Sequence, residues 1–249
     1  MDRIAIISDI HGNIPALEAV LSDISERGIK RIFCLGDLIG KGPHPKQAID
    51  KIKNSCESVV LGNWDDWLTS RPDEEQEHAL WQYQKLDKSE INYLKSLPFS
   101  TEFFMSGRYI RLFHASAESL YKRVQPHAPI EDRLAMFNNT EKTGIPHEEL
   151  TPDVVGYGDI HNAFIQNFKG KVLFNVGSVG NPLEIAQACY TILEGWYGCR
   201  SMSAFSIQLV RVPYDIELAI RQAQEENMPL TEQYANELRT AVYRGSKGI

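Results

Sequence analysis

Cysteine is scarce in this sequence, and long hydrophobic runs are missing. Four cysteines are scattered among 249 residues without the paired spacing of a metal finger: Cys34, Cys56, Cys189 and Cys199. Such usage is typical of a reducing compartment and disfavours a disulfide-linked scaffold. No apolar run approaches the roughly 20 residues that span a bilayer, and the N-terminal segment lacks a small-residue cleavage pattern. We therefore expect a cytoplasmic protein without a membrane segment.

The chain also lacks an excess of positive charge. Its formal net charge is −7, spread along the sequence, with 43% hydrophobic and 24% charged residues. A broad basic surface for a nucleic-acid polymer is therefore disfavoured, although a metal centre could still attract a phosphate group locally. These proportions are close to the soluble globular average, which disfavours extended disorder. Because internal repeats, low-complexity segments and linkers are absent, we predict a single domain over residues 1–249.

The first quarter of the chain alternates between strand-like and helical patterns. Buried-strand runs cover 4–7, 32–35 and 58–61, and helical spacing follows the first two runs, from Pro15 to before Gly28 and over 46–53. Strands that alternate with helices predict a largely parallel sheet with right-handed crossovers. Ligands of such sheets bind at the carboxyl ends of the strands.

The remainder of the chain separates into a helical segment, a strand-rich region and two final helices. Residues 64–97 are predicted to be a mostly helical insertion that either packs on the core or caps the entrance to a site. Strands are predicted over the following ranges: 109–113, 154–156, 163–168, 171–176, 188–193 and 204–212. Because these runs end in polar turns, we expect hairpins in a second sheet. Two helices, at about 216–226 and 231–243, complete the pattern within 216–244.

Short polar clusters follow several of these apolar runs. Their candidate metal ligands are Asp9, His11, Asp37, Asn63, His114, Asp159 and His161. Singly, each carboxylate or amide could close a turn or cap a helix, and each histidine could be a partly buried core residue. Their order along the chain favours a metal site instead, with oxygen and nitrogen ligands and no thiolate. Seven ligands are too many for one ion, but they suit two ions that share a carboxylate.

The order Asp-x-His, Gly-Asp, Gly-Asn, an isolated histidine and Gly-x-x-His resembles the calcineurin-like metallophosphoesterase superfamily. The most similar branch is that of the small YfcE-type phosphodiesterases, with SapH-like phosphatases close to it. The resemblance covers about residues 4–182, and the run 175–180 (Asn-Val-Gly-Ser-Val-Gly) resembles a further signature of that branch. It implies a four-layer α/β/β/α sandwich of two mixed sheets flanked by helices.

The resemblance also implies a chemistry and a division of the ligands. One metal would be held by Asp9, His11 and His161, Asp37 would bridge, and Asn63 and His114 would hold the second metal. The implied enzyme is a dinuclear metal-dependent phosphoesterase in which a metal-bridging hydroxide attacks the phosphorus of a diester or monoester. Asn63 would stabilise the charge that develops in the transition state.

The two ions are expected to be Mn²⁺ or Fe, with Zn, Ni and Mg as alternatives. Expected substrates are small phosphate esters, nucleotide-like ones included, or a phosphoprotein; a homo-oligomer is an open alternative. A Ser/Thr phosphoprotein phosphatase and a protein-binding scaffold with weak catalysis are the competing functions.

Two positions depart from the family pattern. Asp159 stands where the family normally has a histidine; it could still ligate a metal, as a harder and charged donor. Trp64 stands where many members have a proton-donating histidine, and indole cannot act as a general acid. We expect Trp64 to line the pocket, where it would contact the substrate, or to pack against the core, and we favour both over a base-stacking platform. Asp65 is expected to cap the following helix.

Two further expectations concern smaller features. Ser178 is either a turn hydroxyl or a substrate contact. Four histidines are expected on the surface or in loops, with His44 as the most plausible exception because it follows the Asp37 loop: His44, His78, His127 and His147.

Overall fold

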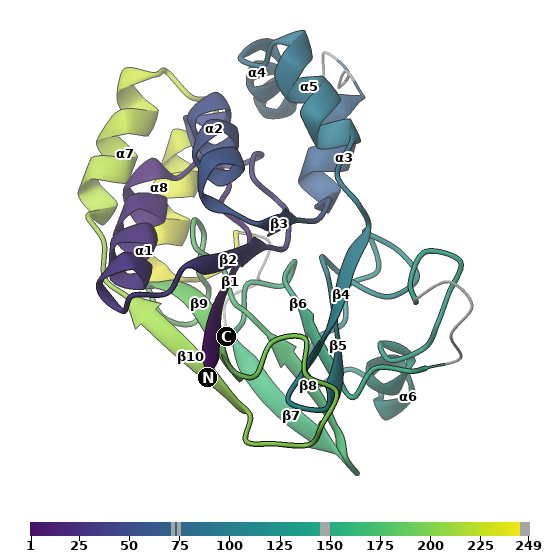
Figure 1. Ribbon diagram of the computed structural model, residues 1–249. Coiled ribbons are helices and arrows are strands. Elements are labelled where there is room, and N and C mark those ends of the chain that lie inside the picture. The colour runs from purple at the N-terminus through teal and green to yellow at the C-terminus, as the bar shows by residue number, and fades with distance from the viewer. Residues whose placement is uncertain (71–72, 74–75, 145–149, 245–249) are drawn as a thin grey trace.

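The computed structural model consists of two five-stranded β-sheets packed face to face, with helices outside the first (Figure 1). It describes residues 1–70, 73, 76–144 and 150–244. Both sheets are mixed, as the resemblance implied, so the predicted α/β sandwich is confirmed. The outer face of the second sheet is covered mainly by loops and one short helix rather than by a full helical layer.

The first sheet combines strands from both ends of the chain. Its order is β10-β9-β1-β2-β3, with bounds Ser206–Val212, Ala188–Gly195, Asp2–Ile7, Arg31–Cys34 and Ser58–Val59. The last three of these strands run parallel, as predicted, whereas β9 is antiparallel to both β1 and β10. We expected the residues of β9 and β10 in the second sheet, and this was wrong. Alternation of side chains shows which face of a strand is buried but not which strand is its neighbour.

The second sheet has the order β4-β5-β6-β8-β7. Its strands are Ser100–Met105, Arg108–Phe113, Val154–Tyr157, Lys171–Asn175 and Phe164–Phe168. The predicted hairpin of this sheet is present as the antiparallel pair β7–β8, and β4 and β5 form a second antiparallel pair. Strand β4 was not predicted, because its first three residues are polar and half-buried and show no clear alternation.

Eight helices occur in the described ranges: α1 (Ile14–Glu26), α2 (Pro45–Ser55), α3 (Asn63–Thr69), α4 (Glu77–Gln84), α5 (Lys88–Lys95), α6 (Ile130–Ala135), α7 (Ile216–Glu225) and α8 (Thr231–Thr240). Helices α3, α4 and α5 occupy the segment predicted to be helical, and α6 was not predicted. The last helix was expected to reach Tyr243 but ends at Thr240, because Ala241 takes a left-handed conformation with φ of 55°.

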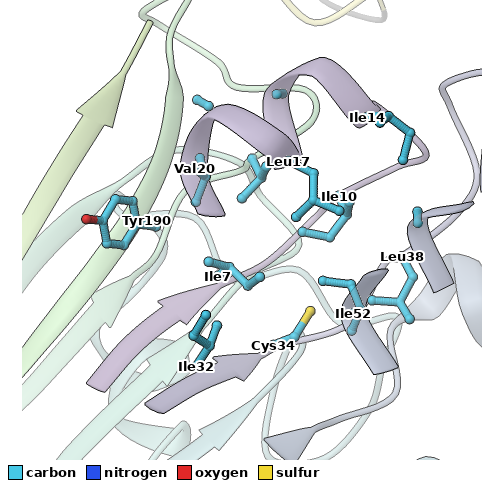
Figure 2. Packing of buried hydrophobic residues seen from close by; sticks show 14 of the residues in the cluster. Ile7, Ile10, Ile14, Leu17, Val20, Ile32, Cys34, Leu38, Ile52 and Tyr190 are labelled. Carbon is cyan, nitrogen blue, oxygen red and sulfur yellow. The ribbon is translucent and has the colours of Figure 1, made fainter. Parts of the chain in front are cut away.

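The core lies in layers on either side of the first sheet. Along β1, Ile4 and Ile6 face the second sheet, whereas Ala5 and Ile7 face the helices. Figure 2 shows Leu17 of α1 packed in the helix-facing cluster with Ile7. All of these side chains are fully buried. This double burial fixes β1 tightly, and so fixes the loop that follows it.

Two further sequence-based expectations concern the cysteines and membrane spanning. All four cysteines are free thiols. No helix in the described part of the chain is both long and apolar enough to cross a membrane.

Candidate metal centre

The predicted metal-binding residues converge at one edge of the two sheets. They lie in loops that follow five strands: Asp9 and His11 after β1, Asp37 after β2, Asn63 after β3, His114 after β5, and Asp159 and His161 after β6. All are buried except Asn63, which is half-buried. Strand ends from both sheets therefore deliver all seven side chains to one place, as expected for an α/β ligand site.

The backbone of this centre is strained. Five of the seven residues have φ between 51° and 64°, in the left-handed region that non-glycine residues rarely adopt: Asp9, His11, Asp37, Asp159 and His161. Each such residue costs about 1–3 kcal/mol, and residues of this kind cluster at functional sites. Concentration of the strain in the ligand loops indicates that side-chain placement there takes precedence over stability.

Hydrogen bonds between neighbouring loops hold this strained backbone. The amide of Asp9 donates to the Gly36 carbonyl (3.0 Å), and the amide of His11 donates to the Asp37 carbonyl (2.9 Å). Gly36 and Gly62 pass so close that a Cβ on Gly36 would collide with the backbone of the other loop. Glycine at these two positions lets the loops after β2 and β3 approach closely enough to share the centre.

The three histidines all direct the same nitrogen towards the centre. Each Nδ1 lies against a backbone carbonyl: His11 against Ile39 (2.9 Å), His114 against Leu35 (2.6 Å) and His161 against Asn181 (2.6 Å). A carbonyl only accepts, so each Nδ1 carries the proton and donates it. Each Nε2 faces the centre, and this arrangement is the usual one for metal-ligating histidines.

The first group of potential ligands comprises Asp9, His11 and His161. The Nε2 atoms of His11 and His161 are 3.1 Å apart, and Asp9 Oδ1 lies 3.2 Å from His161 Nε2. The two Nε2 atoms and this carboxylate oxygen converge on one point, and a cation placed there would be within reach of all three. Asp9 Oδ1 is buried with no hydrogen-bond partner in the described chain. The nitrogen and oxygen atoms of these three side chains are therefore suitable ligands for a metal ion.

Electrostatics keep this group ready for a cation. Burial raises the pKa of Asp9, but His161 and the other histidines outweigh burial, so the net shift is downward and the carboxylate is charged. Burial and the neighbouring His161 lower the pKa of His11 well below its ordinary value. The imidazole of His11 is therefore neutral, which is the form that binds metals.

The second group comprises Asp9, Asp37 and His114. His114 Nε2 lies 3.4 Å from Asp37 Oδ1 and 3.0 Å from the amide oxygen of Asn63. Burial lowers the pKa of His114, but Asp37 and the other carboxylates raise it to a net value of about 10. A metal ion bound among these oxygens would take over the charge compensation and release the histidine proton.

The carboxylates of Asp9 and Asp37 lie between the two groups of potential ligands. Asp9 belongs to both by distance, and Asp37 Oδ2 also lies 3.8 Å from His11 Nε2. The bridging role that the resemblance implied for Asp37 fits this position and stays a prediction.

Asp159 lies at the rim of the centre and has a cationic partner. Its Oδ1 accepts a hydrogen bond from Arg123 Nε (3.2 Å) and is 3.9 Å from His114 Nε2. Its Oδ2 is buried and has no hydrogen-bond partner among the described residues. One oxygen is thus engaged by Arg123 and the other remains free for an ion, so metal binding by Asp159 also stays a prediction.

Two residues singled out in the sequence support the loops. Ser178 is fully buried; its hydroxyl donates to the Asp9 carbonyl (2.8 Å) and accepts from the Asn181 amide (2.9 Å). The hydroxyl proton is therefore used within the protein, which favours the turn over the substrate contact. Asp65 accepts from the amides of Gly62 (3.2 Å) and Leu38 (2.9 Å), so the predicted cap of α3 is confirmed.

A cavity of about 790 Å³ opens above the centre, and Asp37, Asp159 and His161 form its floor. Trp64 lies on its wall, with its ring edge-on to His11 at 6.3 Å, as expected for a residue that lines the pocket. Substrate contact by Trp64 stays a prediction. Lys41 and Arg123 supply positive charge around the anionic floor.

Several functional candidates were not predicted from the sequence. Lys41, Arg123 and Tyr243 line the cavity, and Asn181 holds His161. These residues belong to no motif. Of these residues, only Lys41 could have been found by looking for lysines and arginines close in sequence to the predicted ligands, because it is four residues after Asp37.

The other histidines have varied positions. His127 is exposed in a loop, as predicted, but lines the cavity. His44 is half-buried before α2. The prediction for His78 was wrong, since it is half-buried on α4 with its ring nitrogens at the carbonyls of Gly40 (2.8 Å) and Pro229 (3.0 Å). His147 lies outside the described residues.

Comparisons with known proteins agree with this architecture. Residues 2–195 match the family model of the calcineurin-like phosphoesterase superfamily domain. The uncharacterised protein MJ0912 of Methanocaldococcus jannaschii is 31% identical over 255 residues, covering 91% of this chain and 93% of the relative.

Two solved structures share the fold. A metallophosphoesterase from Sphaerobacter thermophilus aligns with a TM-score of 0.75 at 24% identity, covering 96% of this chain and 100% of its own. Hypothetical protein PH1004 from Pyrococcus horikoshii OT3 aligns with a TM-score of 0.77 at 20% identity, covering 100% of both chains. The family model ends at residue 195, so α7 and α8 lie beyond the matched segment.

Proposed function

Because the chain belongs to the calcineurin-like phosphoesterase superfamily, we propose that it is a metal-dependent hydrolase of phosphate esters. The observation that carries this proposal is the orientation of three buried imidazoles. Each is locked by a backbone carbonyl at Nδ1, and each turns its Nε2 towards the carboxylates of Asp9 and Asp37. Core packing does not require this orientation of the imidazoles, whereas metal-ligating histidines are held in this way.

We assign two divalent ions to the centre. Asp9, His11 and His161 would hold one ion; Asn63 and His114 would hold the second, with Asp37 between them. Carboxylate and amide oxygens with neutral imidazoles suit Mn²⁺ or Fe, and Zn, Ni and Mg remain alternatives. When bound, such ions supply Lewis acidity and lower the pKa of water.

The protein's own side chains would bind and orient the ester. The amide of Asn63 lies beside His114 in the metal centre, where it would stabilise charge on the phosphoryl oxygens. The guanidinium of Arg123, 48% exposed at the rim, can reach a second phosphate oxygen in a charge-assisted hydrogen bond. Since Trp64 cannot donate a proton to the leaving oxygen, we assign that proton to water in the cavity.

The size of the cavity favours a small molecule over a phosphoprotein. A space of about 790 Å³ that is walled by Trp64 and Tyr243 is within the usual range of small-ligand pockets. A folded phosphoprotein would have to present its phosphate on a narrow, extended loop to reach the floor. We therefore place small phosphodiesters and phosphomonoesters first among the substrate classes.

The decisive experiment combines activity with metal content. We expect the Mn²⁺-loaded protein to hydrolyse an activated phosphodiester or phosphomonoester, to lose activity on chelation and to regain it with Mn²⁺. Asp37→Ala should lose bound metal and activity together, whereas Asp23→Asn, which alters an ion pair with Arg27 on α1, should lose neither. Inactivity towards both ester classes at full metal loading would contradict the proposal. Less than about one ion per chain would favour the scaffold function instead, because two-metal hydrolysis requires both sites to be filled.

A further inference from the structure

A second cavity, of about 460 Å³, adjoins the one above the metal centre. The two share Lys41, Trp64 and Tyr243 as lining residues. The second cavity extends from this shared wall towards Trp67 and His78. The two cavities are therefore neighbours that meet at these three side chains.

The second cavity is rich in aromatic rings. Trp64, Trp67 and Tyr243 all line it, and the rings of Trp64 and Trp67 lie 5.2 Å apart at 72°. Lys41 Nζ lies 5.3 Å from the centre of the Tyr243 ring. Rings in different orientations beside a cation favour a flat, polarisable group with hydrogen-bonding edges over an alkyl chain.

The aromatic wall is held in place, although α8 ends before Tyr243. The carboxylate of Glu237 accepts hydrogen bonds from Arg244 Nε (2.9 Å), from its second terminal nitrogen (2.8 Å) and from Asn181 Nδ2 (3.2 Å). The carbonyl of Ala241 accepts from the amide of Glu184 (2.9 Å). Hydrogen bonds thus hold the chain on both sides of Tyr243, at Ala241 and at Arg244.

The opposite side of the second cavity is fixed by His78. Its two ring nitrogens lie against the carbonyls of Gly40 and Pro229, which joins α4 to the loop after β2 and to the segment before α8. A cavity formed in advance reduces the ordering cost of binding a ligand.

We propose that the second cavity binds the nucleoside part of a nucleotide whose phosphate occupies the metal centre, and that Tyr243 is a specificity-determining residue. The proposal rests on the proposed function in that it assumes phosphate binding at the centre. The base stacks on the aromatic wall, Lys41 and Arg123 lie near the phosphate, and a bare phosphate leaves the second cavity unused.

Calorimetric binding of AMP, supplied as a phosphonate analogue whose P–C bond is not hydrolysed, and of inorganic phosphate to the Mn²⁺-loaded protein tests this proposal without turnover. We expect AMP to bind more tightly than phosphate. Tyr243→Ala should weaken AMP binding at least about fivefold, the lower end of a base-stacking contact, and leave phosphate binding unchanged. Tyr243→Phe should retain AMP binding because it keeps the ring.

The matched control is Trp196→Ala, which removes an aromatic ring of similar exposure (49%, against 41% for Tyr243) that lines neither cavity. It should bind both ligands as the wild type does. Equal affinity of the wild type for AMP and phosphate, or unchanged AMP binding by Tyr243→Ala, would overturn the second cavity as a nucleoside site. Ester hydrolysis without a preference for AMP would leave the proposed function intact, whereas a preference for AMP without hydrolysis would contradict only the proposed function.

Discussion

Glu237 joins the C-terminal helix to the metal centre, and its replacement gives the most quantitative test of the structure. Its side chain is fully buried, with Arg244 paired to it at 2.8 Å and Lys41 Nζ at 3.7 Å. Asn181 Nδ2 donates to Glu237, and the Asn181 carbonyl accepts from His161 Nδ1, so Glu237 is one residue removed from a predicted metal ligand. Glu237→Gln keeps the shape of the side chain and removes its charge.

The pKa of Glu237 sets the magnitude of the effect. Burial raises this pKa, but Arg244 and Lys41 outweigh burial and lower it from 4.5 to about 2. A lowered folded-state pKa stabilises the protein above the unfolded value, and the stabilisation is lost as pH falls through the folded value. At about 1.4 kcal/mol per pKa unit, the charge contributes about 3 kcal/mol near neutral pH and about 1 kcal/mol near pH 3.

Urea unfolding in the presence of a chelator measures this contribution without bound metal. We expect Glu237→Gln to lower the free energy of unfolding by about 3 kcal/mol near pH 7, with a smaller difference from wild type as the pH falls towards 3. The control is Glu232→Gln, an exposed glutamate in the first turn of the same helix, which should stay within about 0.5 kcal/mol of wild type. A difference that is independent of pH, or one below about 0.5 kcal/mol near pH 7, would refute the network around Glu237.

Two further predictions concern the metal centre and its rim. Mn²⁺ at about 100 times its dissociation constant should raise the melting temperature of the wild type by about 5–10 °C, measured by calorimetry, and His161→Ala should lose most of this rise. Arg123→Gln should raise the KM for a phosphate ester about tenfold, since it removes a guanidinium that is 48% exposed at the cavity and can bind a phosphate oxygen. An unchanged KM, measured by steady-state kinetics, would exclude Arg123 from phosphate binding.

The predictable part of the site is the part that local sequence specifies. Asp9, Asp37 and Asn63 each follow a parallel strand of the first sheet, and the carboxyl ends of such strands meet at one edge. The order of the motifs then identified the family, which the comparisons confirm. What the sequence could not reveal was the conformation that aims these side chains, because left-handed φ at aspartate and histidine has no local signal.

Long-range contacts account for most of what was missed. Lys41 and Asn181 are 140 residues apart, and Asn181 and Glu237 are 56 apart. The C-terminal segment enters the cavity wall only because α8 stops at Ala241, a residue type with no preference for the left-handed region. Periodicity predicted a helix through this point, and only packing against the Glu184 loop reveals the break.

The conformation of the metal centre therefore lowers the stability of the metal-free protein. Five left-handed residues and an unpaired buried oxygen of Asp9 raise the free energy of the metal-free state. The surrounding sheets tolerate this cost because β1 is buried on both faces and cannot relax. A cation would relieve the electrostatic part of the cost but not the backbone strain. Metal binding should thus stabilise the loops more than the sheets, and hydrogen exchange of the Asp9 and Asp37 loops should slow on Mn²⁺ addition while exchange in β1 stays unchanged.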